Sequence, residues 1–501
     1  MHPADADSRG RTAHSPTSPG RFRPTAAAPP RPAAIAWTWY AGNAALLALL
    51  GLVPVWIRTA LHLYHNYDLG IFAQALHSIR PGDLNPFLPA LDLRLFCDHF
   101  DPILVLVAPL GWLLEPAFAA LAVEHALVLL APLPILLLCR KNPEDTPFAC
   151  LATTYLLFNR GILSALAFPV HPTTWAAFFV VAVGVCAIAR RWAWLALAAI
   201  LLMACKEEFP FAVLMLGLAL GGQRRFRIAA VLVGLAAGWL ILAFGVRPWL
   251  LGATHGYASR VLSPLLADPV ATVWERLRGL GEAKRLFQCL VPLLPAGLWL
   301  GWRRTPLHWP ILVAALPLLA IRFLDGAWRF HYLAPVAPLF LLALWRPKAT
   351  RLPWGCAVLG ILITFLSSGN PLRKGVSAYA AIPELRGARR MAIEQARAHL
   401  LDRPEGRALV EGNLVPLLAR RADVFQIGGV QPAQPYRFFL AEKPPRGDPW
   451  PLAHSDIERI TDEWRTDARA TVLQDDAHVF LAERKPEPEK TPDAAADNHK
   501  E

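Results

Sequence analysis

Short motifs that combine acidic, basic and histidine residues interrupt the long apolar stretches of this chain. They read Tyr67-Asp68-Leu69-Gly70, Asp98-His99-Phe100-Asp101, Pro169-Val170-His171-Pro172, Lys206-Glu207-Glu208 and Arg329-Phe330-His331-Tyr332. Carboxylates and imidazoles can take up protons or bind cations, whereas lysine and arginine neutralise phosphate. These residue types therefore favour acid–base chemistry beside a bound anion.

The first two motifs carry the candidates for catalysis. Asp68 can act as a base or hold a divalent cation, although aspartate is also a favoured residue at a helix start. His99 can bind a metal, a phosphate or a sugar hydroxyl. Asp101 precedes Pro102, and this pair also suits the start of a helix. Because the same predicted loop holds all three side chains, we interpret Asp68, His99 and Asp101 as catalytic.

The remaining motifs are candidates for binding substrate. The prolines beside His171 explain a tight turn but not the histidine, so a functional role and a place at the membrane interface both stay open. Lys206 and Glu207 separate two apolar runs, where charges pair or line a cavity unless they form a solvated hairpin. Lys206 suits a phosphate, and Glu207 suits orienting the lysine or binding a cation. Arg329 and His331 complete the predicted anion-binding set.

The composition indicates which elements must position these motifs. The chain is 55% hydrophobic and only 18% charged, with a mean hydropathy of +0.35, which favours a membrane protein over a water-soluble one. The apolar stretches predict a mainly α, polytopic bundle of about eleven transmembrane helices, within about two. They lie near residues 36–57, 117–139, 147–167, 172–189, 192–205, 209–221, 228–246, 286–302, 308–324, 331–345 and 353–368.

Basic loops alternate with the motifs along the chain and predict its orientation. They are Arg140-Lys141, Arg190-Arg191, Arg224 to Arg227, Arg303-Arg304 and Arg346 to Arg351. Positive loops mark the cytoplasmic side, so the motifs face outward together. The same rule accounts for the net charge of +12 without nucleic acid as a partner.

The predicted domains follow from these spans and from a change of composition near residue 370. Residues 1–35 form a cytoplasmic disordered tail, and residues 36–369 form the membrane domain with long outer loops at 58–101 and 247–285. Residues 370–486 form a small extracytoplasmic α/β domain, and residues 487–501 a second disordered tail. Residues 69–76 suit a helix lying on the membrane. The cations of loop 247–285 indicate either an anion-binding surface or an error in the predicted topology.

Four of the motifs resemble a bacterial family of polytopic membrane proteins of unknown function. The resemblance rests on Tyr67 to Phe72, His99 to Ile103, Phe168 to Pro172 and Lys206 to Glu208, and it covers about residues 40–480. That family is in turn similar to the GT-C glycosyltransferases, which implies a bundle of many spans with an outer domain and polyprenyl-phosphate sugar donors. By position Asp68 matches the GT-C acidic residue. GT-C enzymes often have a pair there, so Asp98 or Asp101 would have to complete it.

These observations predict a multi-pass protein of the bacterial inner membrane, with a cytoplasmic N-terminus, that moves a sugar from a polyprenyl-phosphate donor to an outer acceptor. Its partners would be membrane lipids and that lipid-linked sugar. Whether a metal takes part stays open, and Asp68 and Asp98 are the candidate ligands for a divalent cation, Mg or Mn. The sequence contains no nucleotide-binding signature, which argues against cytoplasmic ATP as the energy source. Two alternatives stay open: a transporter or flippase of lipid-linked intermediates, and a non-catalytic membrane scaffold.

Overall fold

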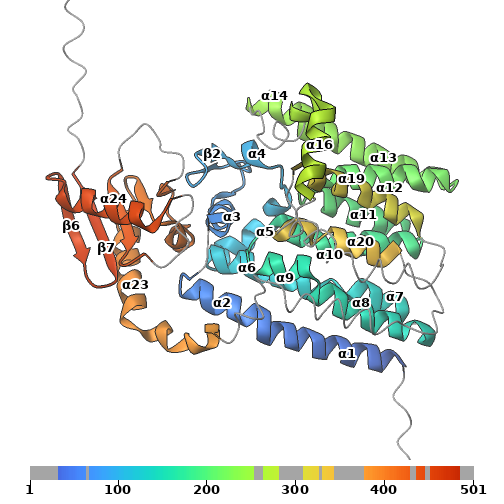
Figure 1. Ribbon diagram of the computed structural model, residues 1–501, viewed down its shortest axis with the longest axis horizontal. Coiled ribbons are helices and arrows are strands. Elements are labelled where there is room, and N and C mark those ends of the chain that lie inside the picture. Colours follow the sequence, from blue (N-terminus) through green and yellow to red (C-terminus); the bar gives the residue numbers. More distant parts are fainter. Residues whose placement is uncertain are drawn as a thin grey trace, which may run out of the picture.

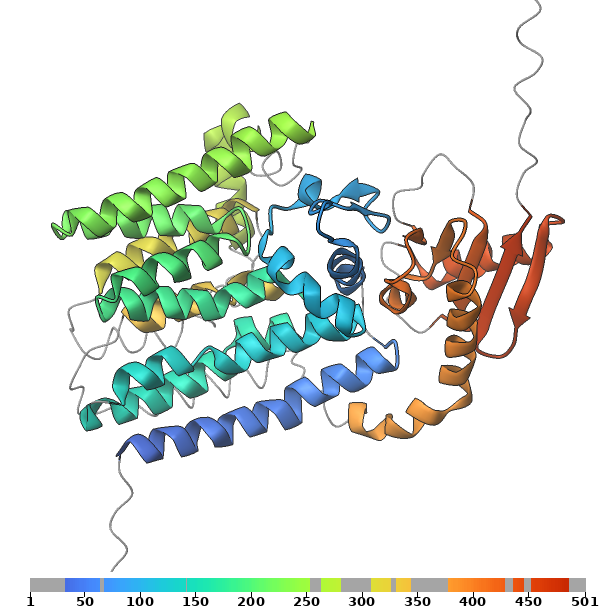
Figure 2. The same cartoon turned by 180° about the vertical axis from the view of Figure 1, so that it is seen from behind.

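The computed structural model describes residues 32–63, 67–140, 142–252, 263–280, 308–325, 330–343, 377–428, 436–445 and 452–485. Apolar helices form a bundle, and a small sheet domain lies beyond one end of it (Figures 1 and 2). In both views α1 and α2 run along one side of the bundle and α13 along the opposite side.

Four helical segments of the described chain are long and apolar enough to cross a membrane. The first, Pro32–Ala60, contains α1 (Pro32–Leu47), a π turn η1 (Ala48–Leu52) and α2 (Val53–Ala60). The second, Pro116–Cys139, contains α6 (Pro116–Leu130) and α7 (Leu133–Cys139), and the third, Thr146–Leu166, contains α8 (Thr146–Phe158) and α9 (Arg160–Leu166). The fourth, Phe226–Leu251, contains α13 (Phe226–Ile241), a π turn η3 (Leu242–Val246) and α14 (Arg247–Leu251). Each coincides with a span that the sequence predicts.

Further apolar helices are shorter. They are α5 (Ile103–Leu113), α10 (Pro172–Ile188), α11 (Trp192–Met203), α12 (Phe209–Gly222), α19 (Trp309–Asp325) and α20 (Val336–Ala343), the last preceded by a 3-10 turn η4 (Phe330–Leu333). A helix of 12 residues such as α11 is only about 18 Å long, well short of the roughly 30 Å apolar layer of a bilayer. The predicted count of eleven is therefore not confirmed. The predicted spans near 286–302 and 353–368 lie outside the described residues.

The predicted outer loop after α2 folds into several short elements. They are α3 (Tyr67–Ser78), the paired strands β1 (Phe87–Leu88) and β2 (Leu93–Arg94), and α4 (Leu95–Asp98). Residues Leu69 to Leu76 of α3 are all buried, so the helix does not lie exposed on a membrane as predicted. It packs against α5, α6 and a 3-10 turn of the C-terminal domain, η6 (Gly412–Leu418). Gly70 permits this contact, because a Cβ there would lie 2.8 Å from Cγ1 of Val415.

The C-terminal domain is built on a five-stranded sheet in the order β4-β3-β5-β7-β6. Its elements are 3-10 turn η5 (Ile382–Arg386), α23 (Ala388–Leu401), β3 (Ala408–Val410), β4 (Val424–Gln426), β5 (Phe438–Glu442), α24 (His454–Thr466), β6 (Ala470–Asp475) and β7 (Val479–Arg484). β3 is parallel to β4 and β5, whereas β7 is antiparallel to β5 and β6. Ile457 and Trp464 of α24 pack on one face, and α23 packs on the other.

Buried hydrogen bonds join this domain to the bundle. The amide of Gln74 in α3 donates to the carbonyl of Val424 at 2.9 Å. The amide of Asn413 donates to the carbonyl of His62 at 3.2 Å, and Arg389 donates to the carbonyl of Leu61 at 2.7 Å. Because these contacts hold the end of the first long apolar segment, the domain fixes the loop that carries Asp68.

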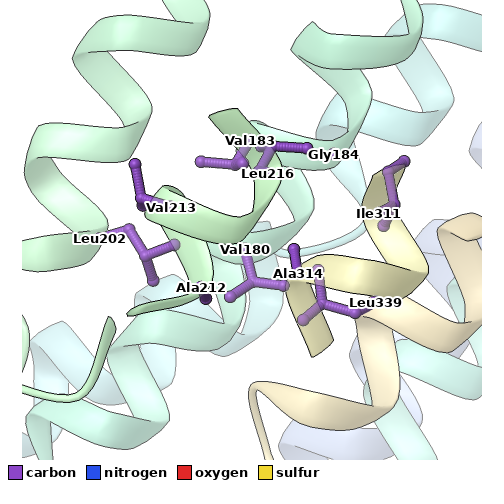
Figure 3. Close-up of a pocket in the computed structure, with 10 residues that line it drawn as sticks. All are labelled: Val180, Val183, Gly184, Leu202, Ala212, Val213, Leu216, Ile311, Ala314 and Leu339. Carbon is purple, nitrogen blue, oxygen red and sulfur yellow. The ribbon is translucent and has the colours of Figure 1, made fainter. Parts of the chain in front are cut away.

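A small cavity in the middle of the bundle is lined by apolar side chains alone (Figure 3). Its volume is about 10 Å³, which is room for roughly one water molecule. The ten lining residues come from α10, α11, α12, α19 and α20 and include no titratable group. This cavity is therefore a packing gap and not a candidate site.

Candidate functional site

Four of the sequence motifs meet at helix starts and turns on one end of the bundle. Asp68 lies in the first turn of α3, and His171 caps the N-terminus of α10. His99 and Asp101 lie between α4 and α5, and Lys206 lies between α11 and α12. The backbone N–H of Ile103 donates to the carbonyl of Ala204 at 2.9 Å, which ties the last two turns together.

Asp68 and His171 form the first pair of the site. Oδ2 of Asp68 lies 3.1 Å from Nε2 of His171, with 25% of the aspartate side chain exposed and 8% of the histidine. The backbone N–H of His171 donates to Oε2 of Glu124, a fully buried residue of α6, at 2.8 Å. Glu124 thus holds the backbone of the buried histidine in place, and Asp68 is the more exposed member of the pair.

His171 also stacks on a second histidine. Its ring centroid lies 3.5 Å from that of His331, at an interplanar angle of 16°. The ring of Phe168 also stacks with that of His171, at a centroid distance of 5.1 Å. Two imidazolium rings at this separation would repel each other, so at most one of the two rings is positively charged. Burial lowers the pKa of His171, against the opposing effect of Asp68. A neutral His171 can donate Nε2–H to the carboxylate.

His99 and Glu207 form a second pair of the same design. Nδ1 of His99 lies 2.9 Å from Oε1 of Glu207, and the side chains are 25% and 1% exposed. The other carboxylate oxygen of Glu207 accepts the backbone N–H of Phe100 at 3.0 Å. Here too a partly exposed residue of the loop is held by a buried residue of the bundle.

A cluster of buried charges lies behind the two pairs. Glu208 forms an ion pair with Arg322, whose guanidinium lies 4.5 Å from the ring centroid of Tyr332. Nζ of Lys206 lies 5.5 Å from the same ring. Asp101 is 3% exposed, and burial raises its pKa to about 7. The site therefore contains both a carboxyl group that titrates near neutrality and a lysine within a few ångströms of aromatic and acidic groups.

The structure brings most of the predicted site residues together. Asp68, His99, Asp101, His171, Lys206, Glu207 and His331 all belong to this cluster. Asp98 is partly buried in α4. Burial raises the pKa of Tyr67 to about 12, and the negative charges of Asp68 and Asp98 add to this rise. Arg329 lies outside the described residues.

Sequence reasoning missed three partners. Asp325 follows Arg322 by three residues in the sequence, yet the structure pairs Arg322 with Glu208, because α12 and α19 pack side by side. Glu124 was not singled out, although it is an isolated acid within the apolar α6, and such a residue marks a functional position. Tyr332 had no signal of its own beyond its place next to His331.

The divalent cation at Asp68 and Asp98 stays a prediction. Within the described ranges, no group of three or more histidine, cysteine, aspartate or glutamate side chains is arranged to hold a metal ion. Asp68 instead engages His171.

The chain belongs to the family described as predicted membrane protein (DUF2079), which matches residues 60–438. The matched region begins at the end of α2, includes every residue of the cluster described above, and ends at the first residue of β5. No curated protein matches the chain. The family thus identifies a membrane protein and leaves its reaction to be inferred from the site.

Proposed function

We propose that this DUF2079 protein is a membrane glycosyltransferase that moves a sugar from a polyprenyl-phosphate donor to an acceptor hydroxyl. The observation that carries the proposal is the pair of Asp68 and His171, a solvent-reached carboxylate held at 3.1 Å by a buried imidazole. A carboxylate in this setting is a suitable general base for a hydroxyl. The charged site at the end of an apolar bundle suits a substrate with a lipid tail and a polar head.

In the proposed reaction the acceptor oxygen attacks the anomeric carbon of the donor sugar. The hydroxyl proton passes to Asp68, the new C–O bond forms, and the bond from the anomeric carbon to the phosphate oxygen breaks. The polyprenyl phosphate leaves with the electron pair of that bond. His171 is then a positioning residue, because its Nε2 orients Asp68 and its ring is too buried to meet the substrate.

His99 is proposed to hydrogen-bond the sugar or the acceptor from the opposite side of the site. Its exposed fraction equals that of Asp68, and Glu207 holds its ring in place. Asp101 lies beside it and titrates near neutrality, so it can exchange a proton with His99 during turnover. Glu207 thus takes a supporting role in place of the direct substrate contact that the sequence predicted.

The proposed location is the bacterial inner membrane, with the N-terminus in the cytoplasm and the C-terminal domain outside. The exposed arginines at Arg190, Arg191 and Arg224 support this orientation, because they lie at the ends of α10, α11 and α12 opposite to the site. A site on the outer face would meet a donor after its transfer across the membrane. This placement suits a lipid-linked sugar better than a soluble nucleotide sugar.

The test is a transfer assay on the purified protein in lipid nanodiscs. A panel of polyprenyl-phosphate hexoses is added, and mass spectrometry measures the released polyprenyl phosphate. We expect release by the wild type and a loss of about 100-fold or more in Asp68→Asn, because the amide cannot take the proton. Asp83→Asn is the matched control, since Asp83 belongs to the same loop and is 53% exposed.

Two results would contradict the proposal. Equal release by the wild type and Asp68→Asn would remove Asp68 from the reaction. Movement of intact lipid-linked sugar between leaflets, with no released carrier from any donor in the panel, would identify the protein as a transporter of lipid-linked intermediates instead.

A further inference from the structure

Arg247 is a buried arginine next to the candidate site, and it has no role in the reaction proposed above. It begins α14, near the end of the long apolar segment Phe226–Leu251, and is only 3% exposed. None of its three guanidinium nitrogens has a hydrogen-bond partner in the part of the chain that the structure describes. A buried charge without an acceptor is strongly unfavourable. In a membrane segment such a charge usually marks a functional site.

The ring of Phe100 lies beside this arginine, and Trp239 lies beside that ring. Cζ of Arg247 lies 5.9 Å from the ring centroid of Phe100, and that ring lies 6.0 Å from the ring of Trp239. The indole Nε1 of Trp239 is also buried without a hydrogen-bond partner among the described residues. The contact with Phe100 offsets part of the charge but accepts none of the N–H groups. We call Arg247, Trp239 and Phe100 the Arg247 subsite.

The Arg247 subsite adjoins the candidate site through a single residue. The backbone N–H of Phe100 donates to Glu207, while the ring of Phe100 faces Arg247. α14 contacts α4, the short helix that leads into His99 (Figures 1 and 2). An anion held by Arg247 would therefore lie beside the segment that carries His99 and Asp101.

The other cations of the site are already balanced by carboxylates. Arg322 is paired with Glu208. Burial by itself lowers the pKa of Lys206, yet neighbours that include Tyr332 and Glu208 hold it above its ordinary value. An incoming phosphate would have to displace these acids or lie among them. Arg247 has no such competitor among the described residues, because no ion pair involves it there.

We infer that the Arg247 subsite binds a phosphate group, through the guanidinium of Arg247 and the indole N–H of Trp239. Arginine presents parallel N–H donors that match two phosphate oxygens, and a buried setting strengthens such bonds. The assignment of this phosphate to the lipid carrier rests on the proposed function. In that reaction the phosphate gains negative charge as it leaves, and the guanidinium stabilises that charge.

The arginines of the neighbouring helix α16 (Pro269–Leu280) provide a contrast and a control. Arg278 is exposed, and its guanidinium lies 5.2 Å from the ring of Trp274. From the sequence, the cations of this stretch indicate either an anion-binding surface or an error in the predicted topology. Arg247 precedes α16 in the chain and differs from Arg278 in two ways: its side chain is buried, and its guanidinium N–H groups have no acceptor among the described residues.

The test measures binding rather than turnover, so it is independent of the transfer assay. Wild type, Arg247→Gln, Trp239→Phe and the control Arg278→Gln are placed in nanodiscs, and three probes are titrated: a polyprenyl monophosphate, the corresponding polyprenol, and inorganic phosphate. We expect Arg247→Gln to weaken binding of the polyprenyl monophosphate by about 10- to 100-fold, and Trp239→Phe by about 3- to 10-fold. Arg278→Gln should match the wild type, and the polyprenol should not depend on Arg247.

Thermal unfolding of the ligand-free protein provides a second readout. An arginine with a purely structural role would lower the melting temperature when it is replaced. If Arg247 instead serves to bind an anion, the melting temperature of Arg247→Gln should equal or exceed that of the wild type, because the variant loses an uncompensated buried charge. Polyprenyl monophosphate should raise the melting temperatures of the wild type and of Arg278→Gln by the same amount, and that of Arg247→Gln by less.

The outcomes separate the sources of the phosphate. Loss of polyprenyl monophosphate binding alone identifies a lipid-linked phosphate, and a parallel loss for inorganic phosphate identifies a site that also admits the free ion. Binding by Arg247→Gln and Trp239→Phe that equals that of Arg278→Gln would overturn the inference. If Arg247→Gln does not fold, unaltered binding in Trp239→Phe overturns it as well. Phosphate binding that depends on Arg247 without sugar transfer would support the subsite and count against the proposed reaction.

Discussion

The two ends of the helical bundle carry charge in opposite ways. At one end Arg190, Arg191 and Arg224 are exposed in short turns between consecutive helices. At the other end Lys206, Glu207 and Glu208 occupy the equivalent turn between α11 and α12, and all three are at most 5% exposed. Exposed charges in short loops are sufficient to orient a membrane protein. Buried charges need partners, and their arrangement is therefore specific.

The two basic turns also share one backbone design. Arg190 and Arg224 have positive φ angles of 54° and 61°, and the next residue in each turn donates back to the helix, to Cys186 and Leu220. The turn at Lys206 to Glu208 has no such residue, since no positive φ occurs there. The basic end thus repeats a simple helix stop, whereas the opposite end is shaped by its side-chain contacts.

The largest expected effect follows from breaking a contact at the buried end. Glu207→Ala removes the acceptor for His99 and for the N–H of Phe100, so we expect about 3–5 kcal/mol less stability and about 100-fold slower transfer. Arg191→Ala at the exposed end should change stability by less than about 0.5 kcal/mol. Melting temperatures and carrier release measure both. Equal effects of the two substitutions would show that burial does not distinguish the two ends.

A pH titration sharpens the comparison at Asp101. Burial raises its folded pKa to about 7, whereas an unfolded aspartate titrates near about 3.9. The unfolded state therefore releases its proton first, so the contribution of Asp101 to wild-type stability should fall as pH rises from about 4 to 7 and level off above that. Asp101→Asn has no such proton, so its stability relative to the wild type should grow over this window, by at most about 4 kcal/mol.

Thermal unfolding at a series of pH values measures this difference. Asp83→Asn is the control, because Asp83 is 53% exposed and should show no comparable dependence. A constant difference between Asp101→Asn and the wild type from pH 4 to 8 would mean that Asp101 has the same pKa in the folded and unfolded states.

The sequence predicted the positions of the apolar helices and the gathering of the motifs, since both follow from hydropathy and from alternation of basic loops. It could not predict which side chains pair. Asp68 meets His171 across 103 residues, and His99 meets Glu207 across 108, so tertiary packing decides these partners. The burial of α3 was missed because it depends on the C-terminal domain, whose Val424 carbonyl accepts a hydrogen bond from the amide of Gln74.

Strands show the same limit. Short apolar runs at 408–411, 423–427, 437–440 and 479–482 predict strands, and these ranges overlap β3, β4, β5 and β7, all largely buried. The sequence did not predict β6, an edge strand whose residues are mostly exposed or half-buried. An edge strand with little burial has no apolar pattern to reveal it, so its pairing with β7 becomes evident only in the folded domain.

The smallest expected effect concerns the backbone of the exposed end. Arg190 lies in the left-handed region at φ 54°, where a residue with a Cβ is less stable than glycine by about 1 kcal/mol. Arg190→Gly should therefore raise the melting temperature slightly and leave carrier release within about 2-fold, because the residue lies a helix length away from the site. Arg191→Gly is the control: its φ is −90°, so glycine brings no relief there and adds flexibility to the unfolded chain. A gain in Arg191→Gly equal to that in Arg190→Gly would attribute the effect to lost charge rather than to backbone conformation.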